Sequence, residues 1–366
     1  MRKLTRKYSA GDASRSRGYT LLELIIAMTL GLIILGGLLT LFSNSNRTHA
    51  ELKKTAEHMG NGSMAMSVLT HDINRAGYYG EFYALPTAST TLPDPCLVTP
   101  APLYYALAFP IQGYDAPAVS PLTCLSNANY VPGTDILVVR YAQFETLAPA
   151  DVPEVGEVYL QGTSNTIEVQ IGAGNAAVGT TKRADGSVAV IFKKNAITAA
   201  DIRKLSVQIY FIAPCSVPAD GSDTCTGAAD DGGMPIPTLK RLELTAVGAT
   251  AGWRVAPLVE GIRSLQIDYG IDNSPNVQNP ATNRFGDGAP DTYVIAPALA
   301  DWANAVSVRI KFIAVSTQLT ASYVDTKTYD LGLAGTVGPF NDAFKKHLFA
   351  GTARLNDVGG RREIPQ

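Results

Sequence analysis

The residues best suited to chemistry are few in this chain of 366 residues, and they form no familiar catalytic motif. The sequence contains no G-x-S-x-G, no H-E-x-x-H and no P-loop, and GAGNAAVG at 172–179 lacks the spacing of a dinucleotide fingerprint. None of the four histidines lies beside an obvious nucleophile; they are His49, His58, His71 and His347. We therefore expect solvated histidines and no enzyme activity.

The cysteines fall into two pairs that are close in sequence, Cys96 with Cys124 and Cys215 with Cys225. Neither pair has the C-x-x-C spacing of zinc and redox sites. In an exported protein two disulfides are the natural interpretation, and the longer closed loop would stabilise the fold by about 3–4 kcal/mol on the chain-entropy model. Four cysteines allow three pairings, and buried free thiols are the alternative. The second pair would close an acidic stretch at 220–233 that predicts a solvated turn.

One acidic stretch offers ligands for a metal ion. Asp272, Asn273, Asp287 and Asp291 lie in DNSPNVQNPATNRFGDGAPDTY, between two predicted strands. Calcium takes roughly six to eight oxygen ligands at about 2.4 Å, and a flexible loop can supply them. The spacing does not match an EF-hand, however, and Asp, Asn and Gly are also ordinary turn formers. Calcium is therefore the less favoured interpretation, and we expect no other cofactor.

A single carboxylate, Glu23, lies inside a long apolar segment. Residues 24–46 are uncharged and begin LIIAMTLGLIILGGLLTLF, and charge returns at Arg47. About 20 helical residues span a bilayer core, so this segment is a candidate membrane helix. A charged group at membrane depth is costly unless it is paired or neutralised, which predicts a function for Glu23. An ordinary signal peptide is the alternative, but the apolar run is long and no small-x-small cleavage site follows it.

The composition supports an exported, folded protein. Hydrophobic residues make up 46% of the chain and charged residues only 17%, with a net charge of -2, which argues against disorder and against direct nucleic-acid binding. Positive charge is concentrated at the start of the chain, in Arg2, Lys3, Arg6, Lys7, Arg15 and Arg17. A basic start, an apolar run and an acidic remainder predict a start held in the cytoplasm and a body exported across the membrane.

The element pattern predicts one long helix followed by strands. No proline occurs before Pro86, and a helix from Tyr19 to about Gly77 would be roughly 88 Å long. An apolar stripe predicts that its second half packs on a head; the stripe consists of Leu52, Ala56, Met59, Met66, Leu69 and Ile73. Residues 78–135 are rich in Pro and Tyr, which predicts an irregular excursion.

Three later segments alternate apolar and polar residues with a period of two, at 205–211, 265–269 and 306–312. This period predicts an antiparallel sheet with one face on a core and the other in solvent. The striped half of the helix is the expected cover for the apolar face. The predicted fold class is α+β, with a single extended head.

The stretch SRSRGYTLLELIIAMTL resembles the class III leader of type IV pilins and pseudopilins. The resemblance implies cleavage by a prepilin peptidase between Gly18 and Tyr19, and methylation of the new N-terminus at Tyr19. Glu23 would then be the fifth mature residue and would pair with the N-terminal amine of a neighbouring subunit during assembly. The commonest residue after the cut is Phe, so Tyr19 is a mild departure that keeps the aromatic character.

Other stretches are similar to PilW-type minor pilins: NGSMAMSVLTHDINRAGYYGEF, LVEGIRSLQIDYGIDN, AVSVRIKFIAVST and DAFKKHLFAGTARLND. The resemblance implies a type IV pilin-like fold, with a long spine helix packed on an antiparallel β-sheet head. It divides the chain into a cleaved cytoplasmic leader (1–18), a spine helix whose first half is membrane-embedded (19–77) and a β-rich periplasmic or extracellular head (78–366).

The resemblance also implies a function. A PilW-type minor pilin would insert in the inner membrane and then help to initiate or tip a type IV pilus. Its partners would be other minor and major pilins, prepilin peptidase, the inner-membrane assembly machinery, the lipid bilayer before assembly and a tip adhesin. Adhesion, twitching and DNA uptake are not distinguished. Two alternatives stay open. One is a minor pseudopilin of a type II secretion system. The other is a membrane-anchored extracellular binding protein, in which the tyrosine pairs at 78–79 and 104–105 would line a sugar-binding site.

Overall fold

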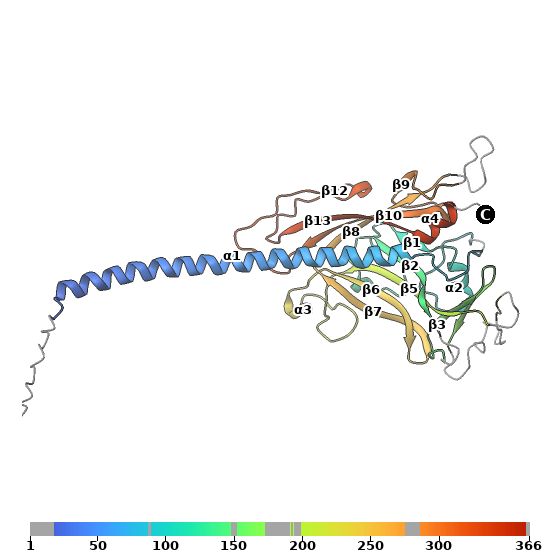
Figure 1. Ribbon diagram of the computed structural model, residues 1–366, viewed down its shortest axis with the longest axis horizontal. Coiled ribbons are helices and arrows are strands. Elements are labelled where there is room, and N and C mark those ends of the chain that lie inside the picture. Colours follow the sequence, from blue (N-terminus) through green and yellow to red (C-terminus); the bar gives the residue numbers. More distant parts are fainter. Residues whose placement is uncertain are drawn as a thin grey trace, which may run out of the picture. The chain divides into compact units, whose positions relative to one another are not determined.

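The computed structural model describes residues 18–86, 89–147, 152–172, 191, 193, 199–274 and 286–363. The chain divides into two compact units, Met1–Lys53 and Lys54–Gln366. Helix α1 (Leu21–Arg75) belongs to both and is continuous (Figure 1). It agrees with the predicted helix to within two residues at each end.

In the first unit, the helix has no protein cover. Every residue from Gly18 to Ala50 is exposed, including the aliphatic side chains of the apolar segment. By length and composition, α1 is the one helix among the described residues that could cross a membrane. Exposed leucine and isoleucine side chains in this number require an apolar surrounding that the described chain does not itself provide.

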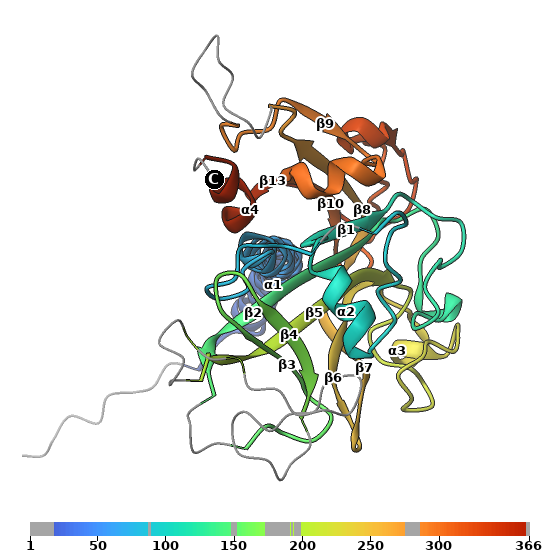
Figure 2. The ribbon, with the colours of Figure 1, turned by 90° about the vertical axis from the view of Figure 1, so that its right-hand side faces the viewer.

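The second unit is built around two antiparallel sheets (Figure 2). The seven-stranded sheet has the order β1 (Ile111–Tyr114), β2 (Ile136–Thr146), β5 (Ile202–Ala213), β3 (Val158–Gly162) and β4 (Ile167–Ile171), and β5 also pairs with β6 (Thr238–Val247), which pairs with β7 (Thr250–Glu260). The four-stranded sheet has the order β13 (Lys346–Arg354), β10 (Ala305–Val315), β8 (Ile262–Ile271) and β9 (Thr292–Val294). The α+β class is therefore confirmed.

Short elements complete this unit. They are α2 (Pro100–Ala106), α3 (Asp230–Gly233), α4 (Asn356–Glu363), the 3-10 turns η1 (Asn127–Asn129), η2 (Leu299–Asn304) and η3 (Gly332–Ala334), and the small sheet of β11 (Tyr329–Asp330) and β12 (Thr336–Val337). The expected strands are β5, β8 and β10. Strands β8 and β10 pair with each other, with Ile267 opposite Ile310.

The expectation of a solvated sheet face is wrong for β5. Leu205 and Val207 pack in one hydrophobic core, whereas Tyr210 and Ile212 pack in a second core on the opposite face. All four side chains are buried. The period of two is real, but it separates two cores rather than a core from water, because both faces of the strand are covered by other parts of the head.

Helix α1 contributes its second half to one of these cores. Ala65, Leu69 and Ile73 are fully buried and pack with side chains from both sheets. Figure 2 shows the helix end-on between β2 of the larger sheet and β13 of the smaller one. The helix therefore fills the space where the two sheets meet, instead of covering a single sheet.

The predicted stripe of α1 is confirmed at Met66, Leu69 and Ile73, which pack in the core, and is wrong at its first three members. Leu52, Ala56 and Met59 are exposed, whereas His58 is buried, so the expected solvation of His58 is also wrong. Gly62 is also on the buried line, and an added Cβ there would lie 2.1 Å from the ring of Phe349. The glycine therefore allows β13 to approach the helix closely.

Candidate functional site

The start of α1 is a capping box that holds Glu23. The backbone N–H of Glu23 donates to the Thr20 hydroxyl at 3.3 Å, and the Glu23 carboxylate accepts from the backbone N–H of Thr20 at 3.5 Å. These reciprocal bonds satisfy two of the amides that a helix start leaves unpaired. This arrangement was not predicted, although the T-x-x-E pattern at 20–23 is its sequence signature.

The capping box gives Glu23 a partner within its own chain. The carboxylate also lies in the first turn of α1, where the helix dipole favours negative charge. Gly18 and Tyr19 precede the helix in non-helical conformation, and both are exposed, Tyr19 by 87%. The Gly18–Tyr19 peptide bond is therefore open to a protease, while Glu23 is held one turn further on.

At the other end, α1 is attached to the larger sheet through a buried carboxylate. The Tyr210 hydroxyl of β5 donates to Oδ2 of Asp72 at 2.5 Å, and a guanidinium nitrogen of Arg241 on β6 lies 3.6 Å from the same oxygen. Burial, and then the charge of Asp72, raises the pKa of Tyr210 well above its usual value. The phenol therefore remains a hydrogen-bond donor, and the buried charge is paired.

The last turn of α1 leads into the run RAGYYG. The guanidinium of Arg75 lies 4.3 Å from the ring centroid of Tyr141, and Gly77 takes a positive φ of 83° that glycine adopts without strain. The N–H of Gly77 donates to the carbonyl of Arg140 at 2.9 Å, and Arg361 of α4 donates to the carbonyl of Gly77 at 3.2 Å. The spine helix, β2 and the C-terminal helix are thus joined at one point.

Comparison with family models matches both functional parts of the chain. The model for type IV pilus-assembly protein W matches residues 225–357, which contain β8, β10 and β13. The model for the prokaryotic N-terminal methylation motif matches residues 13–39, which contain Gly18, Tyr19 and Glu23. These matches support a PilW-type minor pilin with a class III prepilin leader. No curated protein and no solved structure matches it significantly.

The cysteines of this pilin are joined in the structure as Cys96–Cys124 and Cys215–Cys225, which is the local pairing. The first bond lies in the 78–135 excursion, and the indole N–H of Trp253 on β7 donates to the carbonyl of Cys96 at 3.1 Å. Cys215, Cys225 and Asp230 form the one cluster of metal-ligand types in the described part of the pilin. Because its two sulfurs are bonded to each other, no thiolate is available for a metal there.

The acidic stretch at 220–233 is mostly exposed, as expected of a solvated turn, but one of its acids is buried. Asp230 is almost fully buried and accepts backbone N–H bonds from Ala219, Thr226 and Gly227 at 2.7–2.9 Å. The Thr226 hydroxyl also donates to it, and these bonds hold the pKa of Asp230 at about 2 despite burial. The backbone N–H groups of this irregular loop lack carbonyl partners and donate to the Asp230 carboxylate instead. The buried acid therefore stabilises the loop conformation.

The four predicted calcium ligands were expected to surround one point, but the structure does not bring them together in that way. Asp272 is buried, and its Oδ2 accepts from Nε of Arg362 at 2.6 Å. Burial opposes ionisation, but the Arg362 bond and the N–H of Ser274 bring the pKa of Asp272 below its usual value. Asp291 accepts from the N–H of Asn273 at 2.7 Å, and Asp287 is exposed. Residues 275–285 of the same stretch lie outside the described residues.

Arg362 therefore supplies the positive charge beside Asp272. Its other nitrogens donate to the Asp272 and Ser274 carbonyls at 3.0 and 2.5 Å and to the Asn304 side chain at 2.5 Å. This arrangement ties α4 to the ends of β8 and η2. Arg362 was not predicted as a site residue, because nothing near it in sequence indicates a partner 90 residues away.

The tyrosine pairs differ in exposure. Tyr79 is buried, and its environment is that of a packing residue. Tyr105 on α2 is 52% exposed and lines a hollow of about 620 Å³ together with the segment 89–94. The 104–105 pair is thus the one of the two that a ligand can reach, although the family matches give no support to the anchored binding protein.

Proposed function

We propose that this pilin inserts in the inner membrane with its head in the periplasm, is cut by prepilin peptidase between Gly18 and Tyr19, and is methylated at Tyr19. The observation that carries the proposal is the start of α1. An exposed peptide bond precedes Glu23, a carboxylate in a capping box, and the apolar segment that follows is exposed as far as Ala50. The family matches support a structural type IV pilin-like protein rather than an enzyme.

After processing, α1 would move from lipid into the core of a filament. The apolar side chains that face lipid would then face neighbouring helices, and Glu23 would exchange its intrachain bond for the N-terminal amine of a neighbour. Other minor and major pilins would be the partners, and a tip adhesin would be carried by the complex. The large head, residues 78–366, suits an end position, because its bulk would crowd repeated packing along a shaft.

The first test is the intact mass and N-terminal sequence of the membrane protein from strains with and without prepilin peptidase. We expect a chain that begins at methylated Tyr19 only when the peptidase is present. Gly18→Val should abolish the cut, whereas the matched change Gly11→Ala in the leader should leave it intact. A leader kept in both strains, or a cut after the apolar run, would contradict the proposal and favour an anchored binding protein.

The second test addresses assembly. Glu23→Gln should be processed normally but should be depleted from sheared filaments, while Thr29→Ala in the same helix should be retained. Gold labelling of the head should fall on filament ends. Labelling along the shaft, or unchanged pilus number after deletion of the gene, would refute the priming and tip role.

We also propose a calcium site in the 272–291 stretch. Its remaining support is the oxygen chemistry of Asp287 and Asp291, since Asp272 is already paired with Arg362. Calcium should raise the melting temperature of the purified pilin, and Asp291→Ala should remove that increase. An unchanged melting temperature in the presence of calcium would eliminate this site.

A further inference from the structure

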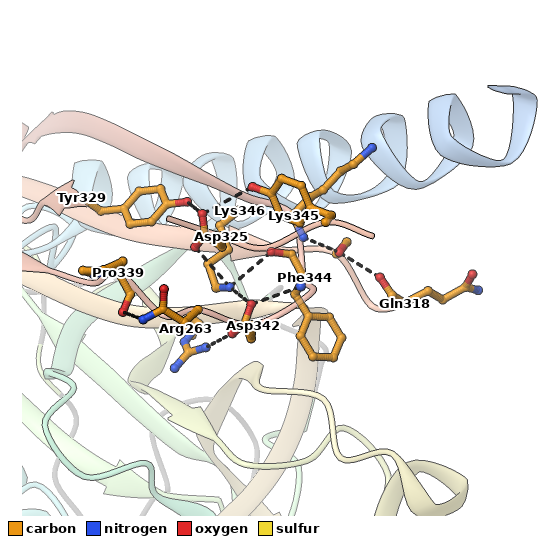
Figure 3. Close-up of polar contacts among 12 residues, drawn as sticks. Arg263, Gln318, Asp325, Tyr329, Pro339, Asp342, Phe344, Lys345 and Lys346 are labelled. Atoms are coloured by element: carbon orange, nitrogen blue, oxygen red, sulfur yellow. Dashed lines mark hydrogen bonds and ion pairs between the residues drawn. The ribbon is translucent and has the colours of Figure 1, made fainter. Parts of the chain in front are cut away.

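A buried lysine lies between two carboxylates at the base of β13 (Figure 3). Lys346, the first residue of this strand, and Asp325, in the segment after β10, both have side chains with no exposed surface. Backbone bonds fix the two segments that hold the acids. The N–H of Asp325 donates to the carbonyl of Asp342 at 2.8 Å, and the N–H of Asn341 donates to the carbonyl of Asp325 at 2.9 Å.

The Lys346 amine contacts two carboxylates, whereas a simple ion pair has one. Nζ of Lys346 lies 3.3 Å from Oδ2 of Asp325, donates to Oδ1 of Asp342 and donates to the carbonyl of Phe344 at 3.2 Å. Asp342 also accepts from the N–H of Phe344 at 3.1 Å, and its side chain is 30% exposed. One carboxylate is thus enclosed with the amine, and the other connects the amine to solvent.

The two oxygens of Asp325 have different surroundings. Oδ1 faces the hydroxyl groups of Tyr329 at 2.9 Å and Tyr323 at 3.3 Å. Oδ2 faces the amine and accepts no hydrogen bond from the part of the chain that the structure describes. Burial, and then Asp325 itself, raises the pKa of Tyr329, so its hydroxyl stays a donor. Two donors on one oxygen polarise the carboxyl group and would stabilise negative charge developing there.

Aromatic and aliphatic side chains limit the access of water to the pair. Nζ of Lys346 lies 5.0 Å from the ring centroid of Phe340, whose ring lies 6.0 Å from that of Tyr329. These rings belong to a small separate core with Ile313 and Leu331. A buried ion pair pays a desolvation cost, which conversion to a neutral amide would remove. Fixed proximity also replaces the entropy cost of joining two groups.

We propose that Lys346 and Asp325 condense to an intramolecular isopeptide bond. Nζ attacks Cγ of Asp325, so the Nζ–Cγ bond forms and the Cγ–Oδ2 bond breaks. Asp342 accepts the two protons that the ammonium loses, one after the other, and passes both to Oδ2, which departs as water. An ammonium and a carboxylate become an amide and one water, Asp342 ends as a carboxylate, and nothing is oxidised or reduced.

The bond would tie the segment after β10 covalently to the edge strand β13. That strand packs against the spine helix, because Phe349 and Gly351 contact Gly62 and Met66 of α1. Unlike the two disulfides, this link would survive reduction. It would therefore hold the last strand of the head in place when a filament is pulled or when the surroundings are reducing.

The test is the intact mass of the full pilin, purified in detergent and fully reduced. We expect the wild-type chain to be lighter by one water than its sequence requires, and a proteolytic digest to yield a branched peptide joining Lys346 to Asp325. Lys346→Met should abolish the deficit, whereas the neighbouring Lys345→Met should keep it. Asp342→Asn should slow bond formation, because the proton carrier is lost.

A second variant checks the assignment of the atoms. Asp325→Asn can form the same amide with loss of ammonia instead of water, so its reacted chain should have the same mass as the reacted wild type. A wild-type mass without the deficit would show a plain buried ion pair and overturn the proposal. A branch at Asp342 would overturn the role of Asp325. Neither outcome depends on leader cleavage or pilus assembly.

Discussion

The two halves of α1 belong to one unbroken helix but use their side chains in opposite ways. Before Lys54, leucines such as Leu32 and Leu39 are 68% and 60% exposed. After Lys54, Ala65, Leu69 and Ile73 have no exposed surface. The first half is apolar around its whole circumference, whereas the second is apolar or small along one line only.

The difference shows which surroundings each half requires. A helix that is apolar all round must be enclosed by lipid or by other helices, because otherwise its apolar side chains would contact water on every side. A helix with one buried line needs a single matched surface, which the two sheets of the head provide. The two carboxylates follow the same division. Among the described residues, Glu23 is bonded to its own helix start, whereas Asp72 is paired with the sheet.

The largest effect that would sharpen this comparison is expected at Leu69. Leu69→Ala removes a fully buried side chain and leaves a cavity, so the free energy of unfolding of the head should fall by about 2–5 kcal/mol. Leu39→Ala, in the first half, is the control and should leave it unchanged. Denaturant unfolding in detergent, followed by near-UV circular dichroism, measures both. Equal effects would erase the distinction between the halves.

A smaller effect is expected at Gly62. Gly62→Leu would drive a side chain into the ring of Phe349, and overpacking of this kind costs about 1–3 kcal/mol. Gly60 lies two residues away on the same helix with open space beside it, so Gly60→Leu should be neutral or slightly stabilising. The same denaturation experiment applies. Tolerance of both leucines would show that α1 does not approach β13 closely.

The smallest effect is expected at Thr20. Thr20→Ala removes the hydroxyl of the capping box, a loss of about 1 kcal/mol that is confined to the first turn. Hydrogen exchange in micelles should accelerate at the amides of the first turn, while head stability stays the same. Thr29→Ala is the control, because that hydroxyl bonds to carbonyls inside the helix. Slow exchange in both variants would show that the box does not hold Glu23.

The local pattern predicted elements well and their surroundings less well. The helix, the strands β5, β8 and β10, and both cysteine pairs appear where the sequence indicated them. The predictions of a solvated face for β5 and of an exposed His58 were wrong. In both cases the error concerns which parts of the chain pack against the residue, and the local sequence pattern does not encode that.

The sequence by itself determined the parts whose causes are local. The leader with Gly18, Tyr19 and Glu23, the apolar run and the period of each strand all follow from neighbours along the chain. Only the tertiary structure decided the rest. It brought Arg362 to Asp272, Tyr210 to Asp72 and Lys346 to Asp325, because a buried charge must find its partner wherever the packing of the sheets brings one within a few ångströms.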